Sequence, residues 1–99
     1  MAKMQVWWIP QVPGKAFTIP VQSVEEAHFL LDMLAAYDMF QFENRIKPDY
    51  CNAGGLQIED EDGWCDWYDE ETGYDFDEWR RDNLPCRFSE IKEASGIKG

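Results

Sequence analysis

The longest segment with a clear hydrophobic period lies between Ser23 and Phe42, and it limits what the rest of the chain can form. Ser23 begins a capping box, because its hydroxyl can accept a hydrogen bond from the backbone N–H of Glu26 while the Glu26 carboxylate reaches back to the Ser23 N–H. Apolar residues then recur at three-and-four spacing, the pattern of a helix with one buried face. We therefore predict a helix that runs from this box to about Gln41 or Phe42.

This predicted helix carries two apolar stripes. The first stripe consists of Val24, Ala27, Leu30, Leu31, Leu34 and Tyr37 or Asp38. The second stripe consists of Phe29, Met33, Ala36 and Phe40. We expect one stripe to pack on a sheet. The other is then either covered by the C-terminal segment or left as a contact surface.

Two pairs of strand-like segments flank the helix. They are Gln5–Ile9 and Phe17–Val21 before it, and Leu56–Glu59 and Trp64–Tyr68 after it. Pro20 makes the second segment an edge strand, and the apolar run of the first predicts a strand with both faces covered. The fold class that follows is α+β, with a ββαββ order. Its four-stranded, mainly antiparallel sheet has one main helix packed on one face.

The remaining segments are predicted to be loops, a short helix and a tail. Residues 44–53 form a loop, because Lys47-Pro48 disfavours helix continuation, and residues 76–83 form a short helix. Residues 84–99 have too few apolar side chains for an independent unit, so we expect them to dock on the body. The 99 residues then make a single domain, with its core at about 4–83 and a C-terminal tail at 84–99.

The charge of the chain is strongly negative and concentrated in one block. The formal net charge is −11, and eleven acids with no Lys or Arg lie between Glu59 and Glu78. Such a field repels nucleic acids and anionic membranes and attracts basic surfaces. We therefore predict a basic surface of a protein as the partner, with no direct binding of nucleic acid and no membrane association.

The cysteines and the apolar runs indicate a cytoplasmic protein. The three cysteines are widely spaced without a Cys-x-x-Cys pair, a pattern that favours a reducing compartment over a disulfide framework. No apolar run approaches the roughly 20 residues of a membrane span. The segment after Lys3 is too short for a secretory signal and contains Pro10 and Pro13.

The sequence offers no convincing metal site or catalytic constellation. The run from Asp60 to Gly63 resembles the start of a calcium loop, but its glycine comes too early. Cys51 with His28 lacks a nucleophile signature, and any chain with 20 acids offers carboxylate pairs such as Asp49 and Asp66 by chance. We predict a protein that is not an enzyme and that needs no metal or cofactor.

The acidic block is also rich in aromatic residues, which are scarce in segments that only solubilise. Trp and Tyr often dominate binding energy, and carboxylates steer a basic partner. We interpret this stretch as a partner-binding surface, with Trp67, Tyr68 and Trp79 as anchors and the acids as steering groups. Its residues are Asp66, Trp67, Tyr68, Asp69, Glu70, Glu71, Asp75, Asp77 and Trp79. In a sharper version of this interpretation, the carboxylates mimic the phosphates of nucleic acid. The alternative is a hairpin whose acids only solubilise.

A second candidate site lies where the chain turns around, between Tyr37 and Gln57. Its ligand loop consists of Asp49, Tyr50, Asn52, Gly54 and Gly55, which offer a stacking ring, amide groups and free backbone N–H groups. A nucleotide-like small ligand is the alternative function that this loop supports. Its nearest bases are Arg45 and Lys47. The competing interpretation is a structural crossover in which Asn52 caps the loop.

Three stretches together resemble a known family. They are VWWIPQVP at 6–13, FQFENRIKPDYCNAGGLQ at 40–57 and WCDWYDEETG at 64–73. They are similar to small acidic proteins of tailed bacteriophages and prophages, some of which are labelled superinfection exclusion. The resemblance covers about Gln5 to Gly73 and transfers no catalytic residues.

This resemblance implies a non-enzymatic phage accessory protein in the host bacterial cell. Such a protein would bind and modulate or inhibit a bacterial or competing-phage component, as in superinfection exclusion or anti-defence. A structural phage component is a further alternative, which would form a symmetric oligomer with the second helix stripe buried. The oligomeric state is left open by the sequence.

Overall fold

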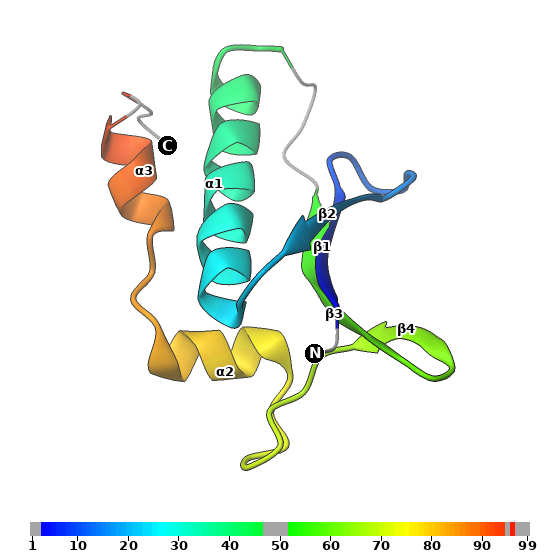
Figure 1. Cartoon of the computed structure of the whole chain (residues 1–99). Coiled ribbons are helices and arrows are strands. Elements are labelled where there is room, and N and C mark those ends of the chain that lie inside the picture. The colour runs from blue at the N-terminus through cyan, green and yellow to red at the C-terminus, as the bar shows by residue number, and fades with distance from the viewer. Residues whose placement is uncertain (1–2, 47–51, 95, 97–99) are drawn as a thin grey trace.

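A four-stranded antiparallel sheet forms one layer of the fold, and helices lie on one side of it (Figure 1). The computed structural model describes residues 3–46, 52–94 and 96. The strands are β1 (Met4–Ile9), β2 (Phe17–Val21), β3 (Ala53–Asp60) and β4 (Gly63–Asp66), in the order β2-β1-β3-β4. The α+β class and the ββαββ order are confirmed, and β2 with its Pro20 is an edge strand.

The main helix, α1 (Val24–Glu43), begins and ends close to its predicted positions. The Ser23 Oγ accepts a hydrogen bond from the Glu26 N–H at 3.1 Å, as the capping box predicts. The Glu26 carboxylate, however, accepts from the N–H of Gln22, at 2.8 Å, and not from that of Ser23. Asn44 caps the other end, where its side-chain amide donates to the carbonyl of Phe40 at 2.8 Å.

The core lies between the sheet and α1. Its buried side chains are Val6, Trp8, Val21 and Leu56 from the sheet, Ala27 and Leu31 from α1, and Phe76 from α2. Because strand side chains alternate, Val6 and Trp8 face this core while Trp7 lies on the opposite face, where it is half-buried. The prediction that both faces of this strand are covered is therefore correct only for the face under α1.

The two strands after α1, β3 and β4, differ in length from the predicted strands. β3 begins at Ala53, so Gly54 and Gly55 lie inside a strand and not in the loop before it. β4 ends at Asp66, two residues earlier than predicted, because the chain turns away from the sheet there.

Two further helices follow the sheet. α2 (Phe76–Asn83) has the predicted bounds, and Asp75 and Glu78 form a reciprocal capping box at its start. The tail also contains α3 (Phe88–Ala94), which packs alongside α1 (Figure 1). Ile91 of α3 lies beside the second stripe of α1, and the Arg87 guanidinium lies 4.7 Å from the centre of the Phe29 ring. The described part of the tail, residues 84–94, thus docks on the body, and residues 88–94 of it form a helix.

A buried carboxylate fastens this C-terminal part to α1. Asp32 lies 3.3 Å from the Nη1 of Arg80 and accepts a hydrogen bond from the backbone N–H of Arg87 at 2.8 Å. His28, one turn earlier, brings its Nε2 to 2.7 Å from the carbonyl oxygen of Pro85. These contacts join α2 and the segment before α3 to the same face of α1.

Candidate functional site

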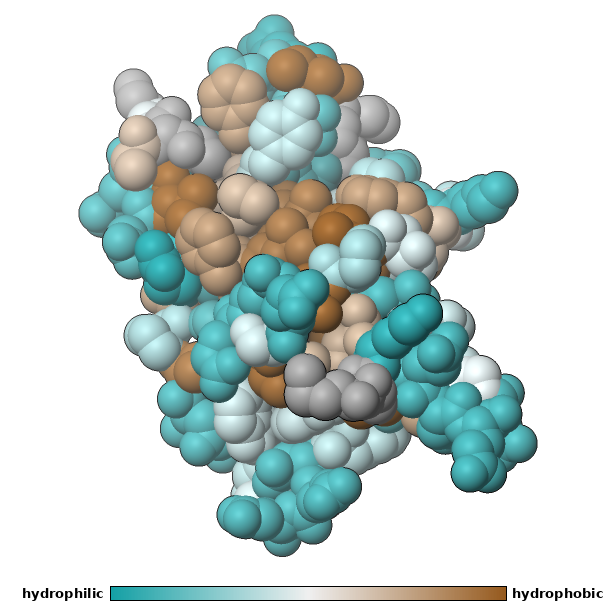
Figure 2. All heavy atoms as spheres, viewed as in Figure 1, coloured by the Kyte–Doolittle hydropathy of each residue, from teal (hydrophilic) through white to brown (hydrophobic). Residues whose placement is uncertain are grey.

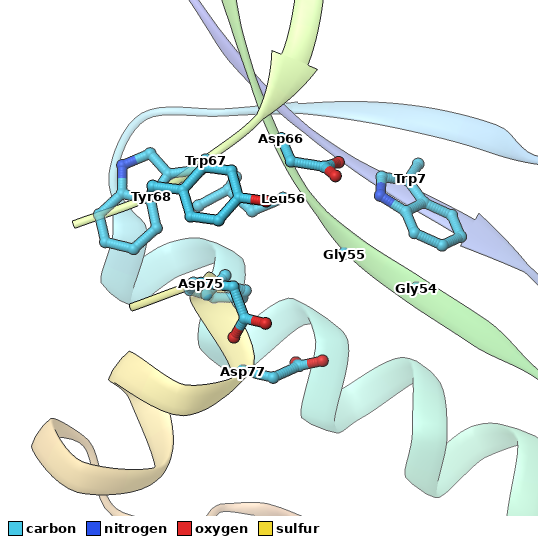
Figure 3. A pocket seen from close by; sticks show the side chains of 10 residues that line it. Trp7, Gly54, Gly55, Leu56, Asp66, Trp67, Tyr68, Asp75 and Asp77 are labelled. Carbon is cyan, nitrogen blue, oxygen red and sulfur yellow. The ribbon is translucent and has the colours of Figure 1, made fainter. Parts of the chain in front are cut away.

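A small hollow lies between the start of β3 and the N-terminus of α2 (Figure 3). Its volume is about 140 Å³. It joins residues from both candidate sites of the sequence, namely Gly54 and Gly55 with Asp66, Trp67, Tyr68, Asp75 and Asp77. Trp7 completes the lining on the side of β1. The sequence did not identify Trp7 as a site residue, because its position depends on how β1 and β3 pair.

The hollow exists because β4 leaves the sheet early. β4 pairs with β3 only as far as Asp66, which lies opposite Gln57. The N–H of Trp67 then donates a last hydrogen bond to the carbonyl of Leu56, at 3.1 Å. Within the described residues, the segment 53–55 of β3 is paired with β1 alone, so its other edge is open.

After Asp66 the chain is drawn toward α2 by aromatic packing. The Trp67 ring makes edge-to-face contacts with Phe76, at 5.9 Å between ring centres, and with Trp79, at 5.5 Å. These contacts hold the Trp67 ring against the core, so Trp67 does not continue β4. Trp67 and Trp79 are both half-buried, so they support the surface from beneath. Tyr68, with 57% of its area exposed, is the predicted anchor that lies openly on the surface.

The two glycines of β3 leave room for the two tryptophans of β1. A Cβ on Gly55 would lie 2.6 Å from the Nε1 of Trp7, and a Cβ on Gly54 would lie 2.6 Å from the Cε3 of Trp8. Neither glycine has a positive φ. Glycine can allow either a positive φ or the close approach of a neighbour. Here the two glycines allow the close approach of the tryptophans.

The charges that line the hollow are all negative within the described chain. Asp66 is exposed, and its carboxylate makes no hydrogen bond or ion pair with a described residue. Asp75 caps α2 by accepting from the Glu78 N–H at 2.9 Å, and Asp77 lies 3.4 Å from the Nε of Arg80. None of the described lining residues is a lysine, an arginine or a histidine. The hollow therefore favours a cation over an anion.

The other predicted steering acids lie in the turn between Tyr68 and Asp75. Asp69 builds this turn, because its carboxylate accepts hydrogen bonds from the N–H of Thr72 at 3.0 Å and from its hydroxyl at 2.8 Å. Glu70 and Glu71 are exposed in the same turn. In Figure 2 the turn and the β3–β4 hairpin are mainly hydrophilic, whereas hydrophobic residues gather over α1.

The predicted ligand loop is described only in part. Asp49 and Tyr50 lie outside the described residues, as do Lys47 and the Cys51 of the nucleophile pair. Asn52 donates its side-chain amide to the carboxylate of Asp38, a residue of α1 that is only 2% exposed. This contact agrees with the interpretation in which Asn52 holds the crossover in place.

The described residues contain no group of three or more His, Cys, Asp or Glu side chains placed to hold a metal ion. Within the same ranges, no helix is long and apolar enough to cross a membrane.

Comparison with known proteins gives this chain a family. The family described as superinfection exclusion gene product 17 matches residues 3–84, from the first strand to the end of α2. A superinfection exclusion protein of Salmonella phage P22 is 51% identical over 86 residues, which cover 74% of this chain and 84% of that protein. No solved structure matches. The chain belongs to the phage family of superinfection exclusion gene product 17.

Proposed function

We propose that this protein excludes superinfecting phage by binding a basic surface of a host or competing-phage protein, without catalysing a reaction. The family and the P22 relative, which is called a superinfection exclusion protein, support the biological role. The binding mode rests on one observation: a hollow lined by carboxylates and aromatic rings, with no base among its described lining residues.

The surface that we assign to binding is the acidic-aromatic face, defined as Asp66, Tyr68, Glu70, Glu71, Asp75 and Asp77. Most of these side chains are exposed, and Tyr68 provides a large ring among them. Trp67 and Trp79 fix the backbone of the face from below through their edge-to-face contact. A rigid backbone that carries exposed acids presents a fixed charge pattern, which gives both steering and specificity.

Within the described residues, only Asp77 among the acids of this face has a basic partner. Asp77 has a nearby arginine, but Arg80 also lies 3.3 Å from the Oδ1 of the buried Asp32. The Asp66 carboxylate makes no hydrogen bond or ion pair with a described residue, and Glu70 and Glu71 are exposed in a turn that has no Lys or Arg. Unpaired surface carboxylates raise the local concentration of basic partners and speed their association.

Nucleic-acid mimicry is a narrower form of the same proposal. In that form the partner's basic surface is a groove that binds DNA or RNA, and the carboxylates take the place of phosphates. Competition between the protein and a DNA duplex for the isolated partner separates the two forms.

The test is an exclusion assay in bacteria that express the protein and are challenged with related phages. The test variant carries Asp66→Asn, Glu70→Gln and Glu71→Gln. The control variant carries Glu43→Gln, Glu61→Gln and Glu93→Gln, which remove the same charge from exposed positions outside the face. Circular dichroism of both variants verifies that they fold.

We expect the test variant to lose exclusion by about tenfold or more, because steering alone changes association rates by that amount, while the control stays active. A pull-down from lysate with the wild type and the test variant should then retain a partner on the wild type only, at low salt. If both variants exclude phage like the wild type, or if both fail equally, the acidic-aromatic face is not the binding site.

A further inference from the structure

We propose that an extended segment of the protein partner pairs with the open edge of β3 as an added strand, and that an arginine side chain of this segment enters the hollow beside β3. This inference rests on the proposed function and names the part of the partner that would be recognised. It follows from the backbone of β3, the charges beside it and the size of the hollow.

The backbone of β3 offers hydrogen-bonding groups at this edge. The carbonyl of Leu56 points toward the β4 side, because it accepts from the N–H of Trp67. Backbone groups alternate along an antiparallel strand, so the N–H and C=O of Gly54 point to the same side. Within the described chain β4 does not extend far enough to cover them. An uncovered edge of this kind is where an extended segment from another protein can pair.

The charge beside this edge selects a basic segment. Figure 3 shows Asp66 and Trp7 on one side of the hollow, with Asp75 and Asp77 at the start of α2 on the other. A second copy of this chain would bring the same carboxylates to the edge, so self-pairing is disfavoured. A cationic side chain would instead meet the Asp66 carboxylate, which has no partner among the described side chains, and the aromatic rings of Trp7 and Tyr68.

The size of the hollow suits one side chain and not a free cofactor. Its volume is about 140 Å³. Pockets for drug-sized ligands or cofactors measure roughly 300–1,000 Å³. Arginine fits this setting better than lysine, because its planar guanidinium bonds carboxylates in a forked geometry and stacks on aromatic rings.

The experiment titrates the ¹⁵N-labelled full chain with a hexapeptide library. In this library arginine is fixed at the third position, and valine, threonine or isoleucine occupies the others. A second library carries citrulline, the neutral analogue of arginine. A third keeps the arginine but has N-methylated backbone nitrogens, which cannot donate to a strand. Asp66→Asn is the test variant, and Glu61→Gln, in the exposed β3–β4 turn, is the matched control.

We expect the arginine library to shift the amide signals of Gly54 and Leu56 and the indole N–H signal of Trp7. The citrulline and N-methylated libraries should bind about tenfold more weakly or worse. The citrulline library lacks the charge-assisted hydrogen bonds, and the N-methylated library lacks the backbone hydrogen bonds. Asp66→Asn should weaken the arginine library to a similar degree, and Glu61→Gln should leave it nearly unchanged.

Three results would overturn the inference. Amide signals that shift elsewhere in the chain would exclude this edge as the binding site. Equal losses of affinity in Asp66→Asn and Glu61→Gln would show only diffuse electrostatic attraction. Tight binding of the N-methylated library would exclude strand pairing. Loss of exclusion in the triple variant without peptide binding at β3 would leave the proposed function standing and remove only this inference. Peptide binding at β3 with exclusion intact in the triple variant would show a strand-pairing site that does not serve exclusion, and it would contradict the proposed function.

Discussion

Trp7 and Gly55 are paired across β1 and β3, and the Trp7 indole occupies the space in which a side chain at position 55 would begin. A Cβ there would lie 2.6 Å from the Nε1 and 3.0 Å from the Cε2 of Trp7. Gly55→Ala should therefore displace the indole and destabilise the protein by about 1–3 kcal/mol, the usual cost of overpacking. Urea unfolding followed by tryptophan fluorescence measures this loss.

The same change in a Trp7→Ala background gives the control. If the indole is the reason for the glycine, Gly55→Ala should cost much less there, and the double-mutant cycle should show a coupling of about 1 kcal/mol or more. An equal cost in both backgrounds would show that Gly55 is required for some other reason, such as the backbone pairing of β3.

A second prediction concerns the carboxylate that joins α1 to the C-terminal helices. Asp32 is buried, contacts Arg80 at 3.3 Å and accepts from the Arg87 N–H at 2.8 Å. Asp32→Ala leaves the guanidinium without this partner, so we expect a loss of about 2–4 kcal/mol, somewhat less than for a fully buried pair. The exposed pair of Arg81 and Asp82 is the control, and Asp82→Ala should cost under about 1 kcal/mol in the same urea titration. Similar losses for both variants would contradict a structural role for Asp32.

A third prediction follows from the thiol of Cys65. Its S–H donates to the carboxylate of Asp60 at 3.4 Å, and this hydrogen bond, with the negative charges of Asp60 and Asp66, raises the pKa of Cys65 above its ordinary value. A raised pKa leaves less thiolate at any pH below it, so this exposed thiol should react slowly with iodoacetamide near pH 8.

Asp60→Asn tests the cause of that slow reaction. The substitution removes the charge that opposes the thiolate, so labelling of the Cys65 peptide, followed by mass spectrometry, should become faster near pH 8. The difference should disappear at a pH above both pKa values, where the thiol is ionised in either protein. Equal rates near pH 8 would show that Asp60 does not control this thiol.

The parts of the fold that local chemistry determines were predictable from the sequence. The capping residues Ser23 and Asp75 place the starts of α1 and α2, because a cap satisfies backbone groups within its own turn. α3 was not predicted, since its seven residues have few apolar side chains and its helix is supported by packing on α1. Short helices of this kind depend on contacts that are distant in the sequence.

The errors in the sheet and the site have a shared physical cause. Gly54 and Gly55 were interpreted as the end of a loop, yet they belong to β3, because they pair with Trp8 and Trp7 of β1. Trp67 was assigned to the last strand, Trp64–Tyr68, yet the strand ends at Asp66 and the Trp67 ring packs on Phe76. The acids of the candidate site could be found from composition. The contribution of Trp7 could not, since it requires the register of β1 against β3.

The last prediction separates the two neighbouring aromatic residues at the edge of the hollow. Trp67 is half-buried and contacts both Phe76 and Trp79, whereas Tyr68 is largely exposed. Trp67→Ala should therefore destabilise the fold by about 2–4 kcal/mol, because it opens a cavity beside α2. Tyr68→Ala should change the free energy of unfolding by only about 0.5 kcal/mol, as at other surface positions.

The effects on phage exclusion should follow a different order from the effects on stability. Tyr68→Ala should weaken exclusion at unchanged stability, because we assign the ring to the binding face. Trp67→Ala should weaken exclusion only in proportion to the protein that unfolds, so growth at lower temperature should restore part of it. Urea unfolding and plating of the challenge phage at two temperatures measure both quantities. Full exclusion by Tyr68→Ala would remove this ring from the binding face, and an unchanged stability of Trp67→Ala would contradict its place in the core.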